Sequence, residues 1–529
     1  MEKYLILNTL NYPILSMLLI VPVVGAIVAM FLRGDTLLKY WSLAVTLVTA
    51  LISIPLWTCF DRTTAKYQFV ELRHWFPELN LEYVVGVDGI SVLLVLLTTF
   101  VMPLCVLCSW TYIQTRLKEF MVVMLLMETA MIGVFMSLNT VLFYIFWEGM
   151  LVPMYLIIAI WGGARKDYAS IKFFLYTFAG SIFLLVSIIA LYINTGTFFI
   201  PELMAHTYSF SFQMWVFIAC ALGFAIKMPM FPFHTWLPAA HVQAPTAGSV
   251  ILASILLKMG GYGFLRFCLP IAPAATYYCV PVLIIMSLIS IIVGGYLALG
   301  QTDIKKLIAY SSVGHMGFVT LGIFLLNDGG IKGAMLQMIN HGVTTGALFI
   351  MIGLIYERTH SREIADNNKL GMMMPIYVTF LGIFSLSSLA FPGTNSFVGE
   401  FLVLFGAFDK YPLVGAIAIP GAILAAAYML RLLQKMVWDD SDGHAHHGDD
   451  SHHIADCNAR EIVQLAFLTI FVFWIGLHPT PLLDVMDTSV AHLIHQVDAG
   501  SVLPEAAHHG EHHALLYDAG AWIKNIVSF

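Results

Sequence analysis

Residues 140–160 of the sequence read TVLFYIFWEGMLVPMYLIIAI, and apart from Thr140 and Glu148 the run holds only apolar, aromatic, glycine and proline residues. A helix crosses the hydrocarbon core of a bilayer, about 30 Å thick, with about 20 predominantly apolar residues. The run therefore predicts a membrane-spanning helix. Glu148 lies nine residues beyond Asn139, which is about 14 Å along a helix that rises about 1.5 Å per residue. Its carboxyl group is thus expected near the middle of the membrane.

The rest of the chain has the same apolar character. Of its 529 residues, 59% are hydrophobic and 11% are charged, whereas a soluble protein carries about a quarter charged residues. We therefore predict an all-α polytopic membrane protein with about 14 membrane-spanning helices. The predicted helices are residues 14–32, 40–57, 90–110, 120–138, 140–160, 171–193, 214–228, 248–269, 277–299, 304–325, 331–355, 375–408, 413–437 and 462–477.

Basic residues are distributed unevenly between the predicted loops. The loops after odd-numbered helices carry more lysine and arginine than the loops after even-numbered helices, for example Arg116, Lys118, Arg165 and Lys166. Cytoplasmic loops of membrane proteins are enriched in these residues. The odd-numbered loops are thus predicted to face the cytoplasm, which places both termini on the outer side.

Several titratable residues share the expected depth of Glu148. Lys258, His315 and His341 each lie nine or ten residues beyond the boundary of a different predicted helix. One charged side chain at the bilayer centre costs about 2.5–3.5 kcal/mol on insertion scales, so such residues usually have a function. Four groups at one depth on four helices predict a site that handles charge in the middle of the membrane.

Two further titratable residues lie where predicted helices are interrupted. Lys227 precedes the segment MPMFP at 228–232, and Glu400 follows the segment FPG at 391–393. Proline and glycine free backbone groups inside the membrane, which is tolerated where the backbone lines a cavity or packs in protein. Broken helices in corresponding positions of two halves point to a transport path between inverted repeats. The breaks fall in the seventh and twelfth predicted helices.

This spacing predicts two inverted repeats of five helices each. The chain then divides into N-terminal helices (1–119), a first repeat (120–270), a second repeat (271–438) and a C-terminal part (439–529) with a histidine-rich loop, one helix and a tail. A carboxylate favours a nearby lysine in its charged form, whereas burial disfavours the charge. A neutral histidine accepts at one nitrogen and donates from the other, which suits proton transfer. The buried set therefore predicts movement of protons.

Structural roles remain as alternatives for some of these residues. Lys227 and Glu148 could form a static ion pair, and His315 and His341 could tie helices together by hydrogen bonds. Three residues keep two roles open: Glu128 as a further titratable group or a packing residue, and His234 and His241 as part of an exit path or of a loop lining. Asp88, just before Gly89, is predicted to cap a helix.

Other chemistry finds little support in the sequence. No G-x-G-x-x-G or P-loop motif follows a strand, and no cysteine cluster has iron–sulfur spacing, so we expect neither nucleotide binding nor a cofactor in this chain. Cys105 and Cys108 lie in an apolar run, where packing is favoured over redox or metal chemistry. The net charge of −7 argues against binding of nucleic acid.

Several motifs in residues 85–435 resemble those of the antiporter-like membrane subunits of respiratory complex I. The matching runs are FWEGMLVPMY (146–155), AIKMP (225–229), HTWLP (234–238), APTAGS (244–249), ILLKMGGYG (255–263), QTDIKKLIAYSSVGHMGF (301–318) and NSFVGEF (395–401). Within this family Glu400 favours the M or ND4 type, because the similar L and N types usually carry lysine there. The chain also lacks the long lateral helix that extends the L type.

The resemblance implies a role in proton translocation for six residues: an ion pair of Glu148 and Lys227 at a first half-channel, a central relay of Lys258 and His315, assistance by His341, and a terminal group at Glu400. It also implies a non-redox subunit of an NADH–quinone oxidoreductase, driven by quinone reduction elsewhere in the complex. The expected partners are the lipid bilayer and other membrane subunits, including further antiporter-like ones. The expected location is the bacterial inner membrane.

The sequence also departs from the family pattern. Ala239 stands where many relatives have a charged residue, which puts in doubt a role of that position in proton entry. The segments 439–453 and 506–513 are rich in histidine; they could bind zinc or nickel, although solvated loops are favoured.

Three rival functions remain. A cation/proton antiporter shares the glutamate and lysine motifs, and a membrane subunit of a hydrogenase or formate-linked complex uses similar helices. The third rival is a scaffold without transport, which the mid-membrane charges disfavour because a scaffold needs none there.

Overall fold

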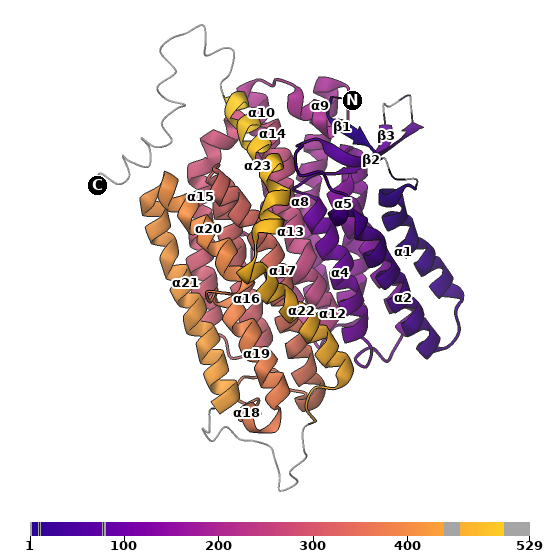
Figure 1. Ribbon diagram of the computed structural model, residues 1–529, viewed down its shortest axis with the longest axis vertical. Coiled ribbons are helices and arrows are strands. Elements are labelled where there is room, and N and C mark those ends of the chain that lie inside the picture. Colours follow the sequence, from indigo (N-terminus) through magenta and orange to yellow (C-terminus); the bar gives the residue numbers. More distant parts are fainter. Residues whose placement is uncertain are drawn as a thin grey trace.

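The computed structural model describes residues 3–8, 10, 12–76, 78, 81–438 and 455–501, and its helices run side by side in one bundle (Figure 1). In the first half the helices, with η marking π-helical turns, are α1 (Ile14–Phe31), α2 (Asp35–Ser53), α3 (Pro55–Thr58), α4 (Val92–Cys108), α5 (Leu117–Met136), α6 (Thr140–Gly149), α7 (Leu151–Trp161), α8 (Lys166–Thr195), α9 (Ile200–Ala205), α10 (Phe210–Lys227), α11 (Trp236–Gln243), α12 (Thr246–Ile251), η2 (Leu252–Leu256), α13 (Leu257–Gly263), η3 (Phe264–Cys268) and α14 (Leu269–Ile271). In the second half they are α15 (Pro273–Leu299), α16 (Ile304–Phe324), α17 (Asp328–Thr359), α18 (Leu370–Met373), α19 (Pro375–Ser388), α20 (Asn395–Lys410), α21 (Pro412–Leu433), η4 (Gln434–Trp438), α22 (Ala459–Leu477) and α23 (Thr480–Ser501).

The predicted membrane helices are present. In the described part of the chain, 12 helical segments are long and apolar enough to cross a membrane, and α4 and α19 are shorter apolar helices. Together they overlap every predicted segment, and both predicted breaks occur, between α10 and α11 and between α19 and α20. The polytopic helical fold is thereby confirmed. The number of helices that cross a bilayer, the two inverted repeats and the boundaries after 119, 270 and 438 stay predictions.

The prediction of an all-α protein needs one addition. Strands β1 (Leu5–Leu7), β2 (Tyr67–Phe76) and β3 (Leu81–Val87) form a small sheet, in which β1 pairs parallel to β2 and β2 pairs antiparallel to β3. The sheet lies at the same end of the bundle as the end of α23 (Figure 1). Neither the sheet nor α23 was predicted from the hydropathy of the sequence. β1 has only three residues and α23 is rich in polar residues, so neither resembles an apolar span.

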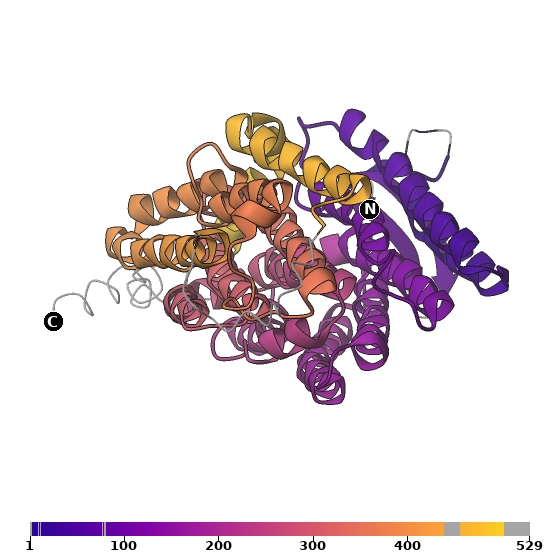
Figure 2. The ribbon, with the colours of Figure 1, turned by 90° about the horizontal axis from the view of Figure 1, so that it is seen from below.

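Both chain ends described by the structure lie on the same face of the bundle (Figure 1). This agrees with the predicted even number of crossings, while the side of the membrane that this face occupies stays a prediction. From below, α22 and α23 lie along one side of the bundle, between the N-terminal helices and the later ones (Figure 2).

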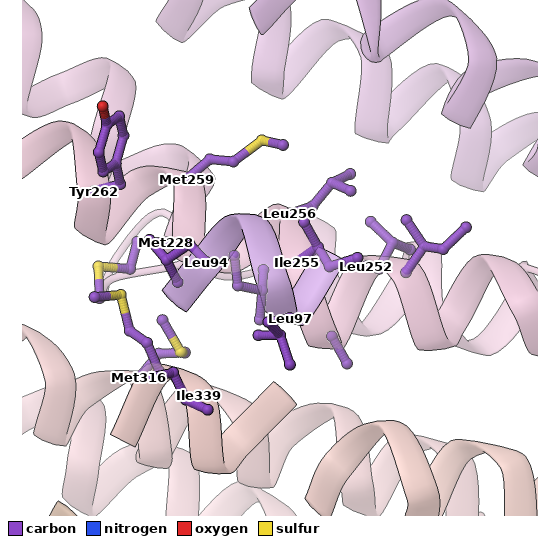
Figure 3. Packing of buried hydrophobic residues seen from close by; sticks show 14 of the residues in the cluster. Leu94, Leu97, Met228, Leu252, Ile255, Leu256, Met259, Tyr262, Met316 and Ile339 are labelled. Atoms are coloured by element: carbon purple, nitrogen blue, oxygen red, sulfur yellow. The ribbon is translucent and has the colours of Figure 1, made fainter. Parts of the chain in front are cut away.

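Two helical segments form the centre of the bundle. The segment 246–271, from α12 to α14, is buried over its most apolar stretch, and so is α17. A helix that is apolar on all sides belongs inside a protein rather than against lipid or water. Leu256 and Met259 from the segment 246–271 share one buried apolar cluster with Met228, Met316 and Ile339, and part of the cluster is shown in Figure 3. This dry, close-packed centre is the surrounding in which the buried charges lie.

Candidate functional site

The predicted titratable residues come from six different helices. Five of them are buried: Lys227 at the end of α10, Lys258 in α13, His315 in α16, His341 in α17 and Glu400 in α20. Glu148, near the end of α6, is only partly buried. An isolated charge in such an apolar interior is costly, so the partners of each group determine what it can do.

Glu400 and His315 are directly joined in the second half of the chain. His315 Nδ1 lies 2.8 Å from Glu400 Oε1, and the Gln337 amide donates to the same oxygen at 2.9 Å. The other ring nitrogen, Nε2, lies 3.3 Å from the Tyr428 hydroxyl and 3.5 Å from the Ser388 hydroxyl. With Nδ1 donating to the carboxylate, Nε2 is an acceptor for the hydroxyls, and the imidazole connects groups on both sides.

Lys258 and His341 form a second buried pair beside the first. Lys258 Nζ lies 2.7 Å from His341 Nδ1 and also donates to the backbone oxygen of Ala253. The rings of His341 and His315 are 5.9 Å apart between centroids. Glu400, His315, His341 and Lys258 therefore form one buried chain of titratable groups that crosses from α20 to α13.

Two π-helical turns flank the central lysine. η2 precedes α13 and η3 follows it, so the helix is widened on both sides of Lys258. In η2, Ser254 Oγ donates to the Gly342 backbone oxygen at 2.7 Å, which ties this turn to α17 next to His341. Such turns are rare and are often found at functional sites. Hydropathy predicted one uninterrupted helix here, because a π-helical turn leaves no mark on an apolar run.

Lys227 has a different surrounding in the first half. Its Nζ lies 5.3 Å from the ring centre of Trp147 and 5.9 Å from that of Phe173. Glu148 is near enough to attract it electrostatically, yet no ion pair within 4.0 Å joins the two among the described residues. The direct Glu148–Lys227 pair that the resemblance implies is thus absent from this arrangement. Because the lysine is buried between aromatic rings, its ammonium group is stabilised by cation–π attraction.

The break after Lys227 is held by the protein itself. The Trp236 indole donates to the Ile226 backbone oxygen at 2.8 Å, and Met230 N donates to the Ala225 backbone oxygen at 3.0 Å. In the second break, the Asn340 amide donates to the Asn395 backbone oxygen at 2.7 Å. Backbone groups at each break thereby find partners within the protein.

The residues with open roles are now placed. Glu128 is fully buried in α5, and neither carboxyl oxygen has a hydrogen-bond partner in the part of the chain that the structure describes. His241 stacks on Phe349, with ring centroids 4.5 Å apart. His234 stacks on Phe231 at 5.6 Å. None of the three belongs to the chain of hydrogen bonds around His315.

Asp88 was predicted to cap a helix, but the N-cap of α4 is Ser91, and Asp88 lies in the turn just before it. Its role is one that the sequence did not reveal. Its Oδ1 accepts from the backbone nitrogens of Ile90 and Ser91 at 3.2 and 3.0 Å. The same oxygen lies 2.6 Å from Arg266 Nη2, in a buried ion pair. Arg266 stands in an apolar run eight residues after Lys258, and that second charge was the available signal.

The predicted histidine-rich segments, 439–453 and 506–513, lie outside the described residues. Within the described ranges, no group of three or more His, Cys, Asp or Glu residues is placed to hold a metal ion. All the described cysteines are free, and most are buried. Packing of Cys105 and Cys108 agrees with their burial.

Comparison with known proteins decides the family. Residues 137–425 match the model of the family described as "NADH:quinone oxidoreductase/Mrp antiporter, TM". The chain belongs to this family. It is 44% identical to NADH-quinone oxidoreductase subunit M of Rhodobacter capsulatus over 515 residues, which is 93% of this chain and 99% of that one. It is 43% identical to NADH-ubiquinone oxidoreductase chain 4 of Arabidopsis thaliana, over 91% and 97% of the two chains.

A solved structure agrees with these relatives. A chain of respiratory complex I from Thermus thermophilus with bound NADH superposes with a TM-score of 0.81 at 27% identity, over 92% of this chain and 99% of that one. The resemblance to the M or ND4 type of antiporter-like subunit is therefore confirmed. With its 12 described helical segments that are long and apolar enough to cross a membrane, this chain is a multi-pass membrane protein of the NADH:quinone oxidoreductase/Mrp antiporter family.

Proposed function

We propose that this chain is the proton-translocating M-type subunit of an NADH–quinone oxidoreductase, and that Glu148, Lys227, Lys258, His315, His341 and Glu400 carry the protons. The observation that supports this best is the buried chain from Glu400 through His315 and His341 to Lys258. Such a chain has little use in a scaffold, because each buried ionisable group costs free energy.

The groups in this chain can exchange protons by small movements. His315 bridges a carboxylate and two hydroxyls, so a proton that arrives on one ring nitrogen can leave from the other. Lys258 already contacts His341 Nδ1. The ring centroids of His341 and His315 are 5.9 Å apart, so rotation of one imidazole would bring a nitrogen of each ring close enough for proton transfer. Glu400 then serves as the terminal group of the second half-channel, as the resemblance implies.

The first half delivers charge to the centre. Lys227 lies between aromatic rings and within the electrostatic reach of the partly exposed Glu148. A carboxylate near the surface of the bundle can be influenced by a neighbouring chain, since its charge and position change the free energy of the ammonium group. We propose that this is how a second antiporter-like subunit acts on the chain.

The energy comes from outside this subunit. Moving one proton against 100 mV requires about 2.3 kcal/mol. We propose that the chain itself holds no redox cofactor and works in the bacterial inner membrane with both termini on the outer side. Quinone reduction in another part of the complex then provides the driving force.

The experiment that tests the proposal is Lys227→Ala in membrane vesicles, with NADH–quinone reduction and acidification measured together. Lys306→Ala is the matched control, because Lys306 is exposed at the start of α16 and lies outside the buried chain. If Lys227 is part of the coupled path, both activities fall sharply in a normally assembled complex while the control is unaffected. Unchanged reduction and acidification in Lys227→Ala would make the buried lysine structural and contradict the proposal.

A further inference from the structure

A cavity with both apolar and polar lining residues opens on the face of the bundle that carries the chain ends. Its volume is 310 Å³, and it is surrounded by the start of β2, the turn before α4, and α9, η3, α14 and α23. Lys3 and Lys66 are exposed beside it, whereas Tyr67, Asp88 and Arg266 are buried. The lining of the cavity therefore includes a group of buried polar side chains beside its apolar residues.

Arg266 is held on three sides in this layer. Its Nη2 donates to Asp88 at 2.6 Å, its Nη1 donates to the Tyr67 hydroxyl at 2.7 Å, and its Nε donates to the Tyr262 hydroxyl at 3.3 Å. The guanidinium also stacks on both tyrosine rings, 5.0 and 5.2 Å from their centres. Because Asp88 is itself held by the backbone nitrogens of Ile90 and Ser91 in the turn before α4, the guanidinium has a fixed position.

The same helical segment carries Arg266 and the central lysine. Lys258, Tyr262 and Arg266 follow one another at spacings of four residues, so they lie on one side of the segment and about 6 Å apart along its axis per step. Tyr262 projects away from the methionine cluster in Figure 3. Arg266 therefore lies between the cavity and Lys258, about 12 Å along the axis from the lysine.

These groups are poor carriers of protons. A guanidinium stays protonated at any ordinary pH and has no acceptor, so it neither releases nor takes up a proton. The Tyr262 hydroxyl accepts from Arg266 and donates to the Phe135 backbone oxygen at 3.3 Å, so its hydrogen is engaged by α5 and not by Lys258. A fixed positive charge in a polar passage also repels incoming cations.

We propose that Arg266, held by Asp88 and Tyr67, is a barrier to protons that separates the Lys258–His341 pair from the water in this cavity. The inference rests on the proposed function, because a barrier is needed only where Lys258 takes part in proton transfer. A path that pumps must never be open to both faces at once, and Arg266, which lines the cavity, lies on the same helical segment as Lys258. Arg266 is thus a positioning residue for the path and not a proton carrier.

The test removes the charges and keeps the hydrogen-bonding shape. The assembled complex with Arg266→Gln and Asp88→Asn together is reconstituted in liposomes, and turnover is blocked with a quinone-site inhibitor. A potassium gradient with valinomycin then imposes a membrane potential, and passive proton entry is followed with a pH-sensitive dye. The single Arg266→Gln leaves Asp88 buried without its cation and risks misassembly, so the double variant is the decisive one.

We expect a several-fold increase in passive proton entry for the double variant over the wild-type complex. The control is Arg358→Gln with Glu461→Gln, which removes an ion pair of the same 2.6 Å length at the other end of the bundle, and it should leave proton entry unchanged. Unchanged entry in an assembled double variant, or an equal increase in the control, would overturn the proposal. Because the enzyme is inhibited, this result is independent of whether Lys227→Ala affects pumping.

Discussion

The two broken helices present their titratable groups in opposite ways. In the second half, Glu400 lies in a network of hydrogen bonds with His315 and Gln337, and His315 continues to Tyr428. In the first half, Lys227 lies between aromatic rings, and its ammonium group has no side-chain hydrogen bond among the residues that the structure describes. One half therefore holds its charge by directional bonds, and the other by aromatic faces and a distant carboxylate.

This difference separates two tasks. A network of hydrogen bonds fixes positions and offers donors and acceptors for proton transfer, which suits a terminal group that exchanges protons. A lysine without such a network responds to electrostatic change at longer range, since few bonds must break when its charge changes. We therefore propose that the first half senses a neighbouring chain through Glu148 and that the second half passes protons on. Lys258 and His341 lie between the two.

The largest effect is expected from Lys258→Met, because this residue serves both halves. Methionine fills a similar volume without the ammonium group, so the fully buried site keeps its packing while His341 loses its partner. We expect NADH-driven acidification to be abolished in assembled vesicles. Met259→Leu is the matched control, since it conserves volume at the neighbouring buried position and should keep acidification. Acidification near the wild-type rate in Lys258→Met would show that proton translocation does not need the ammonium group of Lys258.

A smaller but distinct effect is expected from two substitutions of Glu400. Glu400→Ala leaves the donors of His315 and Gln337 without an acceptor, which costs about 1–3 kcal/mol for each buried group. Glu400→Gln keeps an acceptor oxygen and removes only the charge. We expect both variants to lose most acidification, but only Glu400→Ala to lower the thermal unfolding temperature of the isolated complex. Equal unfolding temperatures would contradict the role of the network in fixing this half.

The depth of the site could be predicted from the sequence, but its connections could not. Helix rise fixes how far Lys258 and His341 lie along their helices, and the two do meet at 2.7 Å. Which helices become neighbours depends on packing between residues far apart in the chain. The sequence therefore does not predict which neighbouring helix each side chain faces. Asp88 and Arg266 are 178 residues apart, and nothing local to Asp88 indicates more than a cap.

The same limit explains what was missed elsewhere. Lys227 has aromatic neighbours from two helices, and a sequence motif with an adjacent glutamate favoured a direct ion pair instead. The sheet and α23 escaped because hydropathy detects long apolar runs, and β1 is too short while α23 is too polar.

A moderate effect is expected from Trp147→Leu, which sharpens the comparison from the first half. Loss of a desolvated cation–π contact costs the ammonium form about 2 kcal/mol, or roughly one pH unit or slightly more in its proton affinity. We therefore expect that, as the pH is raised, acidification by the variant falls to half its maximum at a lower pH than acidification by the wild type. A pH profile of acidification measures this shift. Ser181→Ala is the control, because it removes the hydrogen bond from the Trp147 indole, together with a bond to the Thr177 backbone oxygen, and leaves the aromatic ring in place. An identical profile in Trp147→Leu would mean that the aromatic ring does not hold the charge.

The smallest effect is expected from Ser388→Ala in the second half. Its hydroxyl lies 3.5 Å from His315 Nε2, at the edge of hydrogen-bonding distance, and Tyr428 occupies the same nitrogen at 3.3 Å. Its removal should change the unfolding free energy by less than about 0.5 kcal/mol and leave acidification close to the wild type. Tyr428→Phe should slow acidification more, since it removes the closer hydroxyl. If Ser388→Ala were the more damaging change, the proton would leave His315 toward α19, and Tyr428 would be a support for the ring rather than its partner in transfer.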